Sequence, residues 1–192
     1  MWHLGFLAAA GGWLAGKGRG WYWVILCPLA AAGAGGSPGL WCLAALVGWA
    51  AARDLREMEV PDVVWWLGGG AWVVFGGPVA RETGIAGAYF ALGFGLLLQY
   101  LARGMLGTDG YGDADVLCGV LAGLYLGPLG VCLSLTVGAA AGLVHGVWLR
   151  RRGVLGPGQP FPFLPALCVG VLAAAAFLQF SVAQVHGTGL SL

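Results

Sequence analysis

Long apolar runs separated by short polar links make up almost the whole chain. We place eight such runs, at residues 2–16, 21–36, 39–53, 62–80, 84–102, 115–130, 131–149 and 161–184; the division after residue 130 rests only on the segment "LGPLG". A helix needs about 20 mostly apolar residues to cross a bilayer, and the runs lack the alternation of apolar and polar residues that is typical of membrane barrels. The pattern therefore predicts about eight transmembrane helices, with six to eight as the expected range.

Composition indicates the same class of protein. Of 192 residues, 59% are hydrophobic and 9% are charged, and the mean hydropathy is +0.85. An ordinary soluble domain carries roughly 25% charged residues. We therefore expect an all-α, polytopic membrane helix bundle with no soluble domain of useful size. The first run has no positive residue ahead of its apolar part, so we expect a retained helix and not a cleaved signal peptide.

Charged residues are distributed unevenly over the predicted loops. With eight spans, one side receives eight of the nine basic residues, namely Lys17, Arg19, Arg53, Arg56, Arg103, Arg150, Arg151 and Arg152. Arg81 alone falls on the other side. Because basic loops stay in the cytoplasm, we expect a multi-pass protein of the cell (plasma) membrane with both termini outside. Seven of the eight acidic residues share the cytoplasmic side, so any chemistry is expected there: Asp54, Glu57, Glu59, Asp62, Asp109, Asp113 and Asp115.

The sequence gives little support to metal, cofactor or nucleic-acid sites. The five cysteines lie inside apolar runs without the spacing of metal ligands, and they are expected to be core thiols: Cys27, Cys42, Cys118, Cys132 and Cys168. His145 has no His or Cys four residues away. We find no Gly-rich nucleotide loop and no basic stripe. We therefore expect no cofactor, no metal and no nucleic-acid partner.

The segment "ARDLREMEVPDVVWW", residues 52–66, holds the first acidic cluster. Pro61 and Asp62 are ordinary helix-start residues, because the first backbone N–H groups of a helix lack partners. Asp54 instead ends a predicted helix, where the negative end of the helix dipole disfavours a carboxylate by roughly a few tenths of a kcal/mol. Its helix carries small residues at helical spacing: Ala44, Gly48 and Ala51. Asp54 is therefore expected to face neighbouring helices, where an acid is a functional candidate.

The second cluster is "YGDADVL", residues 111–117. Small residues follow Asp115 at steps of four, at Gly119, Gly123 and Gly127, so Asp115 heads a helix face suited to close contact with other helices. Asp113 would point about 200° away if it is helical, and it would otherwise lie in the loop. The spacing favours Asp115 as the inward carboxylate and leaves Asp113 as the alternative.

Asp54 and Asp115 at one depth would form a recognisable catalytic device. Two carboxyl groups within a few ångströms cannot both ionise cheaply, so they share a proton. The ionised one can act as general base on a water molecule while the protonated one polarises a peptide carbonyl. Such a dyad hydrolyses peptides without a metal or a nucleophilic side chain.

Three motifs resemble those of type IV prepilin peptidases, the GxGD-type intramembrane aspartic proteases that include preflagellin peptidases. "DLREMEVPD", residues 54–62, resembles D-x-R-x-x-x-I-P-[DN], with Val60 in place of Ile. Gly112-Asp113-Ala114-Asp115 is similar to the start of G-x-[GA]-D-x-K-L-L-A-A-L-G, and Gly123 and "LYLG" follow in step. "PFPFLPAL", residues 160–167, resembles the Pro-Phe-x-Pro start of the family's last helix.

The resemblance covers about residues 39–184 and implies a function. It divides the chain into an N-terminal helical hairpin, 1–38, outside the match, and a six-helix aspartic peptidase core, 39–192. It implies cleavage of the leader from prepilins, pseudopilins, Flp-type pilins or archaellins at the cytoplasmic face. Asp54 and Asp115 would be the catalytic pair.

This sequence departs from the family pattern in three respects. "GYGD", residues 110–113, spells the strict GxGD with Asp113 as the acid, so both registers stay open. In the Asp115 register, Leu117 stands where the family motif has Lys. The paired-cysteine domain of the large bacterial members is also absent, which leaves no basis here for their second activity, methylation of the new N-terminus.

Two other classes of protein remain as alternatives. A proton-coupled transporter also uses intramembrane carboxylates, but it would usually hold them near the midplane, whereas these acids lie at span ends. A purely structural membrane partner would need no inward carboxylate at all.

Overall fold

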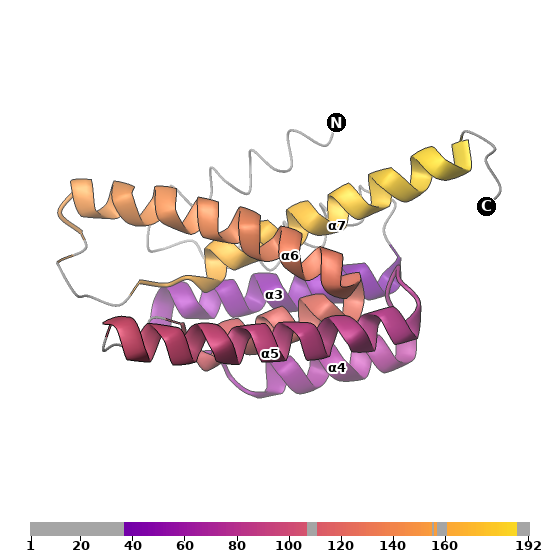
Figure 1. The fold of residues 1–192 in the computed structure, drawn as a ribbon, viewed down its shortest axis with the longest axis horizontal. Coiled ribbons are helices and arrows are strands. Elements are labelled where there is room, and N and C mark those ends of the chain that lie inside the picture. The colour runs from indigo at the N-terminus through magenta and orange to yellow at the C-terminus, as the bar shows by residue number, and fades with distance from the viewer. Residues whose placement is uncertain (1–36, 107–110, 155, 157–160, 188–192) are drawn as a thin grey trace.

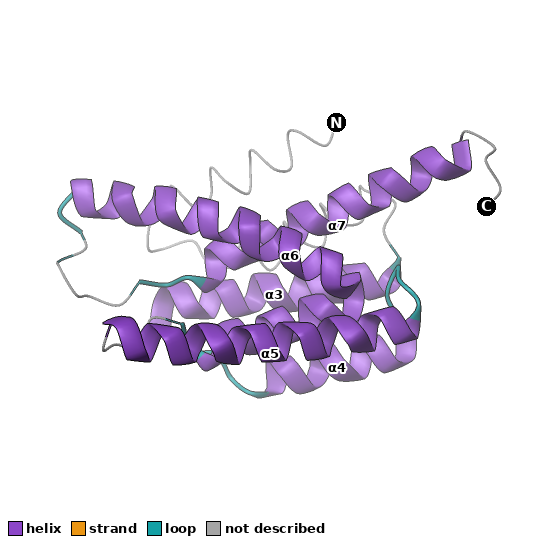
Figure 2. Cartoon of the chain, in the orientation of Figure 1, coloured by secondary structure: helices purple, strands orange, loops and turns teal. Residues whose placement is uncertain are grey.

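The computed structural model describes residues 37–106, 111–154, 156 and 161–187, and all of its regular structure there is helical (Figures 1 and 2). Five helices follow one another: α3 (Pro38–Glu57), α4 (Val63–Phe75), α5 (Arg81–Leu106), α6 (Asp113–Arg151) and α7 (Leu164–Gly187). The all-α prediction is confirmed for these residues. The expected spans at 2–16 and 21–36, and almost all of the expected hairpin 1–38, lie outside the described residues.

Local chemistry explains the short link between α3 and α4. Helix α3 begins with Pro38 in its first turn, a position where a missing N–H costs nothing. It ends where Met58 adopts a left-handed backbone with φ 57°, and the Met58 N–H donates to the Asp54 carbonyl over 3.0 Å. Asp62 occupies the N-cap position of α4, although its side chain makes no capping hydrogen bond. Five residues, 58–62, therefore carry the chain from α3 into α4.

Helix α6 is broken in the middle. Gly127 has φ 69° and ψ −176°, a conformation that favours glycine, and Pro128 follows it without an N–H to continue the helix. The chain reverses there, so that both ends of α6 lie toward the left of Figure 1. The sequence predicts a division after residue 130; the break is real but comes three residues earlier, because Gly127 supplies the left-handed backbone.

The number of candidate spans differs from the prediction. Three described helices are long and apolar enough to cross a membrane, at Arg81–Met105, Asp113–Arg151 and Leu164–Ser181, which is compatible with a membrane protein. Within the described ranges there are thus five helices and three candidate spans, with the broken α6 counted once, not six to eight; two of the predicted spans lie outside these ranges. Helix α4 has 13 residues, about 20 Å at 1.5 Å per residue, against the roughly 30 Å of a bilayer core.

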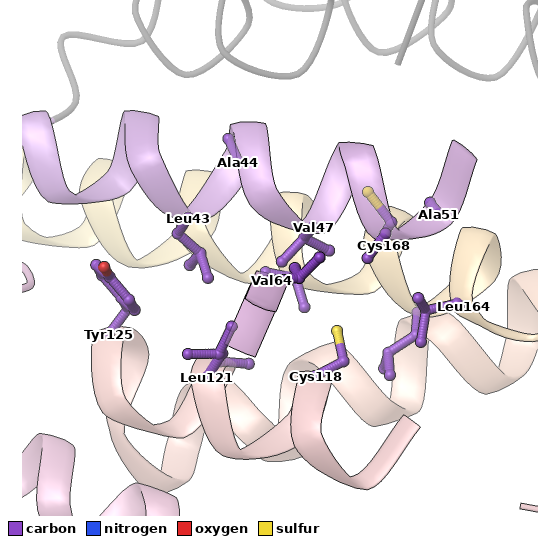
Figure 3. Packing of buried hydrophobic residues seen from close by; sticks show 14 of the residues in the cluster. Leu43, Ala44, Val47, Ala51, Val64, Cys118, Leu121, Tyr125, Leu164 and Cys168 are labelled. Atoms are coloured by element: carbon purple, nitrogen blue, oxygen red, sulfur yellow. The ribbon is translucent and has the colours of Figure 1, made fainter. Parts of the chain in front are cut away.

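The core lies between α3, α6 and α7. Figure 3 shows Leu43 and Val47 of α3 facing Leu121 and Tyr125 of α6, with Val64 of α4 between them. The Tyr125 hydroxyl donates to the Gly68 carbonyl of α4 over 3.0 Å, which satisfies a polar group inside this apolar cluster. At one end the core reaches Cys118 and Leu164, which adjoin the two acidic motifs.

Polar helix ends collect at one end of the molecule. In Figure 1 the last turns of α3, α5 and α6 and the first turn of α7 lie toward the left, whereas α3 and α5 begin at the right. Seven basic residues are described, and six of them belong to the left-hand ends: Arg53, Arg56, Arg103, Arg150, Arg151 and Arg152. Arg81 starts α5 at the opposite end. Most of the described basic residues therefore lie at one end of the bundle, called the basic end below. Both acidic motifs lie at this same end.

Candidate active site

Asp115 is buried at the start of α6. It is 8% exposed and occupies the third position of the helix. Its Oδ2 accepts a hydrogen bond from the Gly112 backbone N–H over 3.0 Å, as in the acidic half of a capping box. The glycines that follow at steps of four are buried as well: Gly119, Gly123 and Gly127. The face that the sequence singles out is thus the interior face of α6.

Asp54 is half-buried in the last turn of α3, and its small-residue face is buried at Ala44, Gly48 and Ala51. The Asp54 Oδ2 accepts a hydrogen bond from the Leu164 backbone N–H over 3.2 Å. Leu164 begins α7, so the positive end of the α7 dipole offsets the unfavourable position of a carboxylate at the end of α3. Burial raises the pKa of the Asp54 carboxyl from 3.8 to about 6, although the Leu164 hydrogen bond opposes the rise.

The fold places these two aspartates at the same end of the core. They are close enough for their charges to interact, although 61 residues separate them in the sequence. The Cys118 thiol, one turn beyond Asp115, lies within reach of both charges. The two carboxyl groups come from α3 and α6 at the basic end of the molecule, where α7 also begins. The arrangement therefore places two carboxyl groups at the same end of the core, one from α3 and one from α6.

Asp113 is placed elsewhere. Its side chain is exposed, and its Oδ1 accepts a hydrogen bond from the Gln99 Nε2 of α5 over 2.8 Å. The two aspartates of "YGDADVL" therefore face different neighbours: Asp113 faces α5 and Asp115 faces the interior. Sequence spacing favours this division but has no means of naming Gln99 as the partner.

An aromatic contact joins the segments that precede α6 and α7. The ring centroids of Tyr111 and Phe163 lie 6.1 Å apart with an interplanar angle of 55°. The Tyr111 hydroxyl also lies 3.5 Å from the Asp115 carbonyl. The N–H that binds Asp54 follows Phe163 directly. This contact thus links the segment that holds Asp115 to the one that holds Asp54. In the sequence, the only indication of this contact is the aromatic and proline content of "PFPFLPAL".

Among the described residues, no group of three or more His, Cys, Asp or Glu side chains lies close enough together to hold a metal ion. His145 is 5% exposed and packs between aromatic rings, with centroids 5.3 Å from Phe161 and 6.0 Å from Trp148. Cys118 and Cys168 are buried, whereas Cys132 is exposed; Cys27 lies outside the described part.

Comparisons with known proteins give no family assignment. No protein-family model matches the chain, and neither the curated proteins nor the solved structures yield a match. A function is therefore inferred from the sequence motifs and from how the fold arranges their residues.

Proposed function

We propose that this protein is an intramembrane aspartic endopeptidase of the type IV prepilin peptidase kind. The observation that carries the proposal is the position of Asp54 and Asp115 at the same end of the bundle, with Asp54 at the end of α3 beside the start of α7 and Asp115 in the first turn of α6. Each side chain comes from a separate family-like motif. Asp54 is held by the backbone N–H of Leu164 at the start of α7, and Asp115 by the N–H of Gly112 within its own motif.

In the proposed mechanism, the two carboxyl groups hold one proton between them. The ionised carboxylate takes a proton from a water molecule, which attacks the scissile carbonyl, while the protonated carboxyl donates to the carbonyl oxygen. Collapse of the tetrahedral intermediate returns a proton to the leaving amine and restores the shared proton. Their titration belongs to the pair, so neither aspartate is assigned permanently as the base.

The substrates would be precursors of pilins, pseudopilins, Flp-type pilins or archaellins, cleaved before their apolar helix. Co-expression with such precursors, followed by N-terminal sequencing of the mature product, tests the proposal. A new N-terminus directly before the apolar helix is the expected result. Uncleaved precursors throughout a representative set would contradict it.

We further propose that the chain lies in the cell membrane with its basic end in the cytoplasm, in keeping with the positive-inside rule. Single cysteines introduced at positions 56, 109 and 151 are expected to react with a membrane-impermeant maleimide only from the cytoplasmic side. A cysteine at position 82 is expected to react from outside. If positions 56 and 109 labelled from opposite sides, the two acids could not meet and the dyad would be excluded.

Inhibitors distinguish the dyad from other hydrolases. Because no metal or covalent intermediate takes part, chelators and serine or cysteine reagents are expected to leave cleavage intact; the buried Cys118 is also shielded from such reagents. Carbodiimide modification of carboxyl groups is expected to abolish cleavage. Cleavage assays on purified protein in detergent measure both effects. Loss of activity with a chelator would require a metal step and contradict the mechanism.

The break in α6 provides an observation that bears on the alternative of a proton-coupled transporter, since transporters hold ions at broken helices. Asp115 lies 12 residues before Gly127, about 18 Å along a helix, so the acids are far from the break. This placement favours the peptidase over the transporter.

A further inference from the structure

Gln99 is a buried amide in an apolar stretch of α5, "GLLLQYL", residues 95–101. It is 8% exposed, and its Nε2 donates to the Asp113 Oδ1 over 2.8 Å. A buried polar group is costly unless it is hydrogen-bonded, and a bond to a charged acceptor is stronger than one between neutral groups. The amide is therefore tied to the first turn of α6 and not to its own helix.

The first turn of α6 carries two carboxylates that point in different directions, and only one can face α3. One turn before Gln99, Gly95 of α5 packs against the Val116 side chain of α6, where a larger residue would be crowded. The hydrogen bond from Gln99 draws Asp113 toward α5. The rotation of the helix that satisfies this bond is the same rotation that buries Asp115.

We propose that Gln99 is a positioning residue: by holding Asp113 against α5, it fixes the rotation of the α6 start that points Asp115 at Asp54. The inference rests on the proposed peptidase function for its catalytic consequence, but the positioning itself is a property of the fold. Gln99 acts on the dyad through Asp113, its hydrogen-bond partner.

Variants that separate the hydrogen bond from the charge test this idea. Gln99→Met keeps the side-chain length and removes the donor, and Asp113→Ala removes the acceptor. Each is expected to lower kcat about tenfold or more with little change in KM, since a small misplacement of a reacting group is costly. Asp113→Asn loses the charge but keeps an acceptor oxygen, so it is expected to rescue most of the activity lost in Asp113→Ala. Combining Gln99→Met with Asp113→Ala should cost no more than either change alone.

Tyr100→Phe is the matched control. Tyr100 is the next residue of α5 and is 75% exposed, so loss of its hydroxyl removes a polar atom from the same helix without touching α6. It is expected to leave kcat unchanged.

Carboxyl labelling supplies a readout that is independent of cleavage. With a water-soluble carbodiimide and an amine, followed by peptide mass spectrometry, the exposed Asp113 of the native protein is expected to be modified before the buried Asp115. Modification of Asp115 is expected to rise several-fold in Gln99→Met. In Asp113→Asn, which keeps the hydrogen bond to Gln99, it is expected to stay low. Unchanged Asp115 labelling in Gln99→Met would overturn the positioning role, whatever the activity. If Asp115 labelling rises in Gln99→Met but the native protein cleaves no precursor, the positioning role is retained and the peptidase function is rejected.

Discussion

Asp54→Asn and Asp115→Asn are each expected to lower precursor cleavage by about a hundredfold to ten-thousandfold, the range that a positioned acid or base contributes. Each substitution changes few atoms but removes the proton that the pair shares. Both amides still accept the hydrogen bonds from Leu164 and Gly112, so the variants should accumulate in the membrane like the native protein. Mobility of a co-expressed precursor on gels, normalised to the amount of enzyme, measures the loss.

Two other aspartates complete this experiment. Asp62 is exposed at the start of α4, so Asp62→Asn is expected to cleave normally. Asp113→Asn is expected to retain most activity, because Asn can still accept from Gln99. The opposite pattern, with Asp113→Asn inactive and Asp115→Asn active, would establish the strict GxGD register and show that the pairing of Asp54 with Asp115 as the dyad is wrong.

Gly87→Ala is expected to destabilise the bundle by about 1–3 kcal/mol, the usual effect of overpacking a close contact. A Cβ on Gly87 would clash with the backbone carbonyl of Gly123 and would come within 2.7 Å of the Gly127 backbone. Neither neighbour is a flexible side chain that could move aside, so α5 and α6 must separate. Denaturation of the purified protein in detergent, followed by circular dichroism, measures the change.

Gly93→Ala is the control on the same helix. No atom lies within 4 Å of a Cβ at that position, so the change should be neutral or should stabilise α5 by about 0.5–1 kcal/mol, as Ala does over Gly within helices. Equal effects of the two substitutions would contradict the close approach of α5 to α6.

The helical class and the interior faces of α3 and α6 can be predicted from the sequence. Residues of one helix face recur every three or four positions, so Ala44, Gly48 and Ala51 point to Asp54 as an inward acid without reference to any other helix. The same local rule separates Asp113 from Asp115. In both cases the relevant geometry is contained within a single helix.

Contacts between helices cannot be predicted in this way. The Leu164 N–H that binds Asp54 lies 110 residues away, and the role of Gln99 depends on the rotation of α5 against α6. The predicted break in α6 lies three residues too late because the segment "LGPLG" offers two glycines, and local preference does not decide which one takes the left-handed backbone. The apolar run that contains α4 predicts a longer helix because it continues past Phe75, where the left-handed Gly76 ends the helix.

The hydrogen bond between Asp54 and Leu164 also sets the order in which the site can be assembled during translation. The ribosome adds about 5–20 residues per second, so about 5–20 s pass between the synthesis of Asp54 and that of its partner 110 residues later. Throughout that interval the Asp54 carboxylate at the end of α3 lacks the hydrogen bond from Leu164. If the proposed peptidase function is correct, the nascent protein is expected to stay inactive until α7 has been made. A chain released before α7 would carry both aspartates but would lack the Leu164 N–H that holds Asp54.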